Sequence, residues 1–78
     1  MEDDGRKKPV ETMKVVVNGS EKVVASCLTV GGLVGEMGLG KQAVAVEVNR
    51  VLVPRREHEL VRLKEGDVVE LVTLVGGG

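Results

Sequence analysis

The apolar run at residues 68–75 constrains the fold most, because it predicts a strand late in the chain. Successive side chains of a strand point to opposite faces of its sheet. An unpaired carboxylate is costly to bury, so Glu70 predicts which face is the outer one. That face would also carry Val68, Val72 and Leu74, with Val69, Leu71 and Thr73 facing the core. The alternative is a strand that is buried on both faces.

Three glycines, Gly76, Gly77 and Gly78, follow this run directly. Glycine has no Cβ and the broadest backbone freedom, so we expect residues 76–78 to form a flexible tail. Fully extended, the tail would span roughly 10 Å. We therefore expect the terminal carboxylate of Gly78 to be the functional group. The alternative is an ordinary frayed end, which is common at chain termini.

The composition predicts one small domain and excludes several classes of partner. The 78 residues include no Phe, Tyr or Trp, so no aromatic platform is available for base stacking. Residues 1–12 hold three of the eleven basic and four of the twelve acidic residues, which leaves eight of each in the rest. A balanced surface of this kind predicts neither a nucleic-acid nor a membrane partner. With no signal peptide or long apolar span, a cytoplasmic location is expected.

The single cysteine and the single histidine give no sign of a metal or catalytic site. Cys27 lies in an apolar stretch, where a free cysteine is usually a small buried hydrophobic residue; the alternative is a reactive thiol. His58 lies in the charged segment 55–59, and we expect a solvated side chain in a loop or short helix rather than a catalytic base.

The first half of the chain predicts a flexible leader, a hairpin and a helix. Residues 1–12 are polar, and the domain is expected over residues 13–75. A strand at 13–17 precedes Asn18-Gly19, a strong signal for a tight turn, and the partner strand is expected at 22–26. A helix should then begin after Thr29 and end at Gly38, with an apolar contact from Leu39. Its buried face would carry Val30, Leu33, Val34 and Met37, while Gly31, Gly32 and Gly35 weaken it.

The second half predicts three further strands. Residues 43–48 alternate between valine and smaller or polar residues, and a turn at Asn49-Arg50 leads into a strand at 51–53 that Pro54 stops. One helical turn at 55–59 and a tight turn at 64–67 precede the last strand. The predicted fold is α+β: one main helix packed across a mixed sheet of four to five strands, which is the β-grasp or ubiquitin-like arrangement.

Two segments resemble the bacterial thiamine sulfur-carrier proteins, the ThiS family. Residues 49–55, Asn-Arg-Val-Leu-Val-Pro-Arg, are similar to its N-x-x-x-V-P-R segment. Residues 66–72, Gly-Asp-Val-Val-Glu-Leu-Val, followed by the final glycines, resemble its G-D-x-V-E-I-V…G-G ending. The resemblance covers residues 13–78, and the glycine-rich helix and the leader at 1–12 depart from the family pattern.

The resemblance implies a carrier rather than an enzyme. The carboxylate of Gly78 is ionised at neutral pH and is a poor electrophile, so it needs activation. In the family, an E1-like adenylating enzyme (ThiF-type) consumes ATP to adenylate the terminal glycine, and a sulfur donor protein supplies the sulfur. The resulting thiocarboxylate gives its sulfur to thiazole synthase (ThiG-type) for the thiazole ring of thiamine. No bound cofactor is implied.

A carrier also needs a docking face. We expect Val72 and Leu74, exposed beside the tail, to form an apolar binding surface, with Arg50 and Arg55 at its rim. Four alternative functions remain open. They are the small subunit of molybdopterin synthase, a ubiquitin-like covalent modifier, a regulatory or RNA-associated β-grasp module, and a small enzyme.

Overall fold

The structure, a computed structural model, describes residues 11–74. Most of the expected leader, Val75 and the tail glycines Gly76, Gly77 and Gly78 lie outside the described residues. The described elements, in chain order, are β1 (Thr12–Val17), β2 (Ser20–Ala25), α1 (Val30–Glu36), β3 (Val44–Val48), β4 (Val51–Val53), the 3₁₀ helix η1 (Arg55–Glu57) and β5 (Val68–Thr73).

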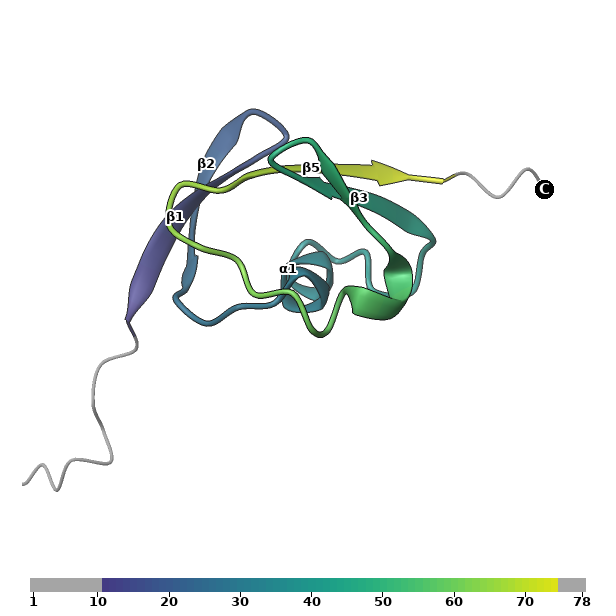
Figure 1. The fold of residues 1–78 in the computed structure, drawn as a ribbon, viewed down its shortest axis with the longest axis horizontal. Coiled ribbons are helices and arrows are strands. Elements are labelled where there is room, and N and C mark those ends of the chain that lie inside the picture. Colours follow the sequence, from purple (N-terminus) through teal and green to yellow (C-terminus); the bar gives the residue numbers. More distant parts are fainter. Residues whose placement is uncertain (1–10, 75–78) are drawn as a thin grey trace, which may run out of the picture.

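The five strands form one mixed sheet in the order β2-β1-β5-β3-β4, and α1 lies across one face of it (Figure 1). The last strand is central: β5 pairs in parallel with β1 and antiparallel with β3. The predicted α+β architecture with a mixed sheet and one main helix is confirmed. Within residues 11–74, no helix is long and apolar enough to cross a membrane.

Both hairpins turn through two residues with positive φ. Val17 pairs with Ser20 across Asn18 (φ 49°) and Gly19 (φ 86°). In the same way, β3 and β4 are joined by Asn49 (φ 51°) and Arg50 (φ 70°). Such turns match the right-handed twist of the strands they join. Because pairing starts immediately after the first turn, β2 runs over Ser20–Ala25 rather than the predicted 22–26.

Helix α1 has the two predicted ends. The Thr29 hydroxyl accepts a hydrogen bond from the Gly32 N–H at 3.0 Å, which satisfies one of the free donors of the first turn. At the other end Gly38 has φ +78°, and the Leu39 N–H donates to the Val34 carbonyl at 3.0 Å. This is a Schellman motif, in which a left-handed residue closes the helix.

The core between α1 and the sheet is entirely aliphatic apart from one methionine. Its most deeply buried side chains are Val15, Val30, Leu33, Val46 and Val69. The prediction for Met37 was wrong: it is 40% exposed, because it is the residue at which the helix ends and not part of a packed turn.

Cys27 also departs from its prediction, since the structure places it at the surface. It lies in the turn that joins β2 to α1. Its neighbour Leu28 is the residue of this turn that packs against the core. The apolar stretch therefore reaches the core through Leu28, and Cys27 projects away from it.

Candidate functional site

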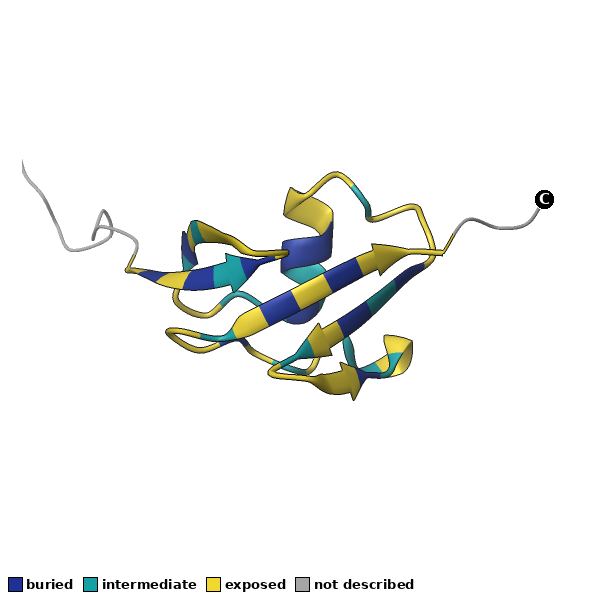
Figure 2. Cartoon of the chain, turned by 90° about the horizontal axis from the view of Figure 1, so that it is seen from above, coloured by how far each residue is buried: buried dark blue, intermediate teal, exposed yellow. Residues whose placement is uncertain are grey.

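The two faces of β5 differ as the sequence predicts, except at Thr73, which was expected to face the core but is exposed because it lies at the end of the strand, beyond the buried residues. Val69 and Leu71 are buried, while Val68, Glu70 and Val72 are exposed, so the strand is striped along its length (Figure 2). Leu74, just beyond the strand, is 54% exposed. The prediction of an outer face marked by Glu70 is confirmed, and burial on both faces is excluded.

Four exposed aliphatic side chains lie on this outer face. We call them the outer apolar patch: Leu52, Val68, Val72 and Leu74, each between 43% and 61% exposed. Leu52 and Val72 line a shallow depression of about 520 Å³ together with Ala45, Glu47, Arg50 and Glu70. The patch therefore joins β4 to β5, and the depression between them is lined by Ala45 and Glu47 of the intervening strand β3.

Two acidic residues and one basic residue lie within this surface. Glu47 of β3 is directly opposite Glu70 of β5 in the antiparallel register. Like charges placed directly opposite each other on one face of a sheet are destabilising. Arg50, at the β3–β4 turn, lines two neighbouring depressions that Glu70 also lines. The outer face thus combines an apolar centre with charged groups of both signs.

The structure brings together three of the four predicted docking residues. Val72 and Arg50 line the same depression. The Leu74 N–H still donates to the Ala43 carbonyl, so strand alternation puts Leu74 on the same face as Val72. Arg55 lies elsewhere: it lines a depression of about 290 Å³ on the helix side of the sheet, with Gly31 and Val34 of α1. Binding by any of these residues stays a prediction.

Leu52 is an exposed residue that the sequence analysis did not single out. It is 61% exposed and lies directly opposite Glu47, on the outer face. Its outward direction follows from the burial of Val53, because successive strand residues face opposite sides of the sheet. The sequence alone gives no such signal, because all three residues of β4 are apolar.

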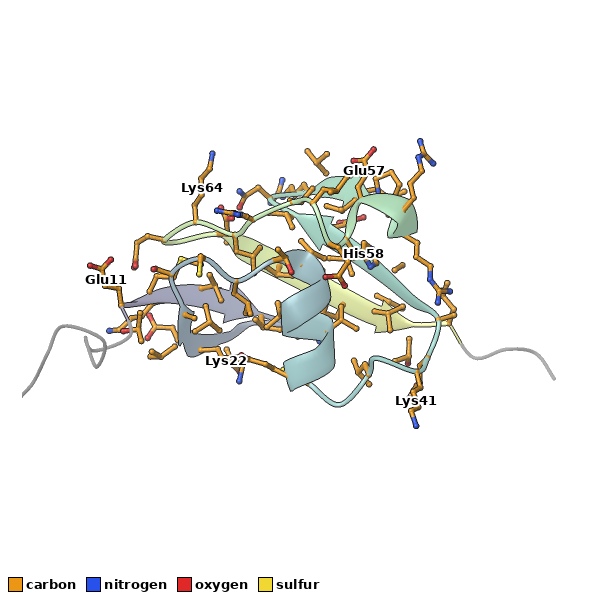
Figure 3. The ribbon with its side chains drawn as sticks, turned by 90° about the horizontal axis from the view of Figure 1, so that it is seen from below. Glu11, Lys22, Lys41, Glu57, His58 and Lys64 are labelled. Carbon is orange, nitrogen blue, oxygen red and sulfur yellow. The ribbon has the colours of Figure 1, made fainter. Side chains whose placement is uncertain are left out.

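His58 lies at the end of the short helix η1, as predicted, but its side chain is only partly solvated. It is half-buried beside α1 on the underside of the sheet (Figure 3), and its Nε2 lies 3.1 Å from the Val53 carbonyl oxygen. It therefore fastens the segment after η1 to the end of β4. Within residues 11–74, no group of three or more His, Cys, Asp or Glu side chains is arranged to hold a metal ion.

A turn asparagine holds each end of β5. At the end nearest the tail, the Leu71 N–H donates to Asn18 Oδ1 at 2.8 Å, and Asn18 Nδ2 donates to the Leu71 carbonyl at 3.3 Å. At the other end, the Val68 N–H donates to Asn49 Oδ1 at 2.9 Å. The backbone N–H of Asn49 donates to the Val68 carbonyl at 2.7 Å. The sequence predicts both turns but neither of these contacts with the last strand.

Comparison with known proteins identifies a family and a solved structure that agree with each other. Residues 9–78 match the model of the ThiS family. A crystal structure of a thiamine biosynthesis protein (ThiS) from Geobacter metallireducens superposes with a TM-score of 0.72 at 32% identity. That match covers 85% of this chain and all of the other.

Two thiazole synthases are also similar over part of their length. The chain is 41% identical over 66 residues to one from Paramagnetospirillum magneticum, and 36% identical over 66 residues to one from Magnetococcus marinus. The match covers 85% of this chain but only 20% of each synthase. The family match covers most of the chain and includes the final glycines, and the solved structure has the same fold; the chain belongs to the ThiS family.

Proposed function

We propose that this protein is a sulfur carrier in thiamine biosynthesis, with the terminal carboxylate of Gly78 as the group that carries sulfur. The observation that supports this most is the ThiS family match, which extends through Gly78. The described domain contributes a stable sheet from whose central strand the tail continues. The protein acts as a cosubstrate in this proposal, and the chemistry of activation belongs to a separate enzyme.

The proposed chemistry runs in two steps. An oxygen of the Gly78 carboxylate attacks the α-phosphorus of ATP, pyrophosphate leaves, and an acyl-adenylate forms. Hydrosulfide (HS⁻) released from a donor protein then attacks the carbonyl carbon, AMP leaves, and loss of the S–H proton gives the thiocarboxylate. An adenylating enzyme of the ThiF type carries out the first step and consumes the ATP. We place this reaction in the cytoplasm.

Thiazole synthase is the proposed recipient of the sulfur. Two proteins of that name contain a segment similar to this chain within a much longer polypeptide. A carrier and its recipient that are joined in one polypeptide are held at a high effective concentration of each other. A carrier on a separate chain would instead recognise its recipient through a docking face.

We propose that the outer apolar patch is that docking face. Only Val75 separates Leu74 from the tail in the sequence, so a partner that covers Val72 and Leu74 is placed to receive Gly78. An exposed apolar cluster of this kind is typical of a protein–protein interface. Arg50 lies at its rim and would add a charged contact, whereas Arg55 lies on the helix side and is not included.

The mass of the intact protein tests the function. We would incubate it with ATP, Mg²⁺, a ThiF-type enzyme and a sulfur source. The expected product is heavier by the difference between one sulfur and one oxygen atom. Deletion of Gly78 should abolish this gain. Deletion of residues 2–8, which lie outside the family match, should leave it unchanged.

The alternatives predict other products. A covalent modifier would be joined to lysine side chains, and a molybdopterin synthase subunit would give its sulfur to a pterin precursor rather than to thiazole. No mass gain with an enzyme that is demonstrably active on another ThiS protein would contradict the proposed function.

A further inference from the structure

The edge of β5 that faces β1 is only partly paired. The polar backbone groups of successive strand residues point to opposite edges. On the β1 edge, the Val69 carbonyl accepts from the Asn18 N–H at 2.9 Å. Leu71, two residues on, uses both its N–H and its carbonyl to bind the Asn18 side chain. The next residue on this edge is Thr73.

Thr73 lies beyond the reach of β1. The registered pairs between β1 and β5 are Val16 with Val68 and Val17 with Val69, after which the chain turns away at Asn18. Leu74 uses the opposite edge, where its N–H donates to the Ala43 carbonyl at 2.8 Å. Among residues 11–74, no hydrogen bond reaches the backbone of Thr73 from the β1 side. The N–H and carbonyl of Thr73 therefore form an open edge inside the sheet.

Both outer edges of the sheet have features that prevent pairing with another strand, whereas the edge at Thr73 has none of them. The edge strand β2 carries Glu21 and Lys22, and β4 is three residues long and ends at Pro54. Charges, short length and proline are the usual means by which proteins prevent unwanted strand pairing. Thr73 instead lies between Val72 and Leu74, both uncharged and exposed.

We propose that an extended segment of thiazole synthase adds as a strand to β5 at Thr73, next to the Asn18 side chain. Strand addition supplies a backbone carbonyl for the Thr73 N–H and a backbone N–H for its carbonyl. The edge is continuous with Val72 and Leu74 of the outer apolar patch, so one partner can cover both. Because the Asn18 side chain already binds the backbone of Leu71, Thr73 is the first residue of this edge whose backbone is available to an added strand. This inference rests on the proposed function for its choice of partner.

Replacement of Thr73 by proline is the direct test. Proline removes the N–H and is tolerated in a strand where that N–H does not pair within the sheet. Thr73→Pro should keep the fold and weaken binding to thiazole synthase by about tenfold or more, because the partner's carbonyl is left without a donor. Isothermal titration of wild type and variant with purified thiazole synthase measures the ratio.

Val23→Pro is the matched control. Val23 lies opposite Lys14, whose N–H donates away from β2, to Glu65 Oε1 at 3.1 Å. Val23 therefore belongs to a pair that is not hydrogen-bonded, and its own N–H points to the open edge of β2. Val23→Pro thus places a proline ring on the open edge of β2, away from the tail. This variant should bind thiazole synthase as the wild type does.

A second variant covers the case in which Thr73→Pro does not fold. Chemical ligation can replace Thr73 by the corresponding α-hydroxy acid, which keeps the side chain and exchanges only the N–H for an oxygen. It should show the same loss of affinity. Equal affinity of the folded variant and the wild type would overturn strand addition alone. A wild-type chain that does not bind thiazole synthase would instead overturn the proposed partner.

Discussion

Asn18 and Asn49 have the same left-handed backbone conformation, with φ of 49° and 51°, and their side chains hold opposite ends of the same strand. Each residue therefore has two roles. Its backbone makes a tight hairpin turn, and its side-chain amide continues the hydrogen bonding of β5 where the neighbouring strand has turned away. The position of the central strand depends on both residues.

Asn18→Gly and Asn49→Gly should each lower the free energy of unfolding by about 1–2 kcal/mol. Glycine accepts the positive φ, so each variant removes the amide without straining the turn. Because the two contacts are at opposite ends of β5, the effects should add. Urea denaturation of the two single variants and of the double variant measures these losses. Ser20→Gly, beside the first turn, is the control for the cost of an added glycine, and a loss no larger than in this control would contradict the prediction.

Gly35→Ala should stabilise the protein by about 0.5–1 kcal/mol. A Cβ at Gly35 meets nothing within 4 Å, so alanine adds helix propensity without a clash. Gly38→Ala is the matched opposite case. Its surroundings are equally open, but its φ of +78° disfavours any side chain, and it should destabilise the protein. Thermal melting of both variants checks the prediction, and a change of the same sign in both would contradict it.

Val72→Lys should reduce the rate of thiocarboxylate formation or the affinity for thiazole synthase by about tenfold, since it places a charge in the proposed docking face. Val23→Lys is a close control, because Val72 and Val23 are exposed to nearly the same extent, 56% and 58%. The control should retain activity, and both variants should keep the melting temperature of the wild type. Equal loss of activity in the two variants would argue against the outer apolar patch.

Cys27 should react with iodoacetamide in the folded protein at a rate close to that in urea, because its side chain is exposed. Mass spectrometry over time, with and without denaturant, gives the two rates. Cys27→Ser should change the free energy of unfolding by less than about 0.5 kcal/mol, as expected for a surface position. Strong protection of the thiol in the folded state would contradict the exposed placement.

The order and type of the elements could be predicted because their signals are local. Asn18-Gly19 marks a hairpin on its own, and Thr29 and Gly38 mark the two ends of the helix. The alternation around Glu70 also correctly identified the outer face of β5. Each of these inferences uses only residues that lie close together in the sequence.

The incorrect or missing predictions concern residues whose positions depend on tertiary contacts. Asn18 and Leu71 are 53 residues apart in sequence, and no local pattern indicates that they bind each other. Arg50 and Arg55 look equivalent in the sequence, yet the turn, β4 and η1 between them place the two on different sides of the sheet. Cys27 lies in an apolar stretch, but a turn directs its side chain to the solvent.

The central position of β5 has a consequence for how the protein is made. The sheet order β2-β1-β5-β3-β4 places β5, the last strand of the described residues, between two hairpins that otherwise do not adjoin. Until Val68–Thr73 is available, β2-β1 and β3-β4 remain separate two-stranded ribbons, which are at best marginally stable in water. A chain that ends before β5 is therefore expected to lack a stable sheet. Formation of the sheet therefore requires that the chain be translated at least through β5, the strand that precedes its glycines.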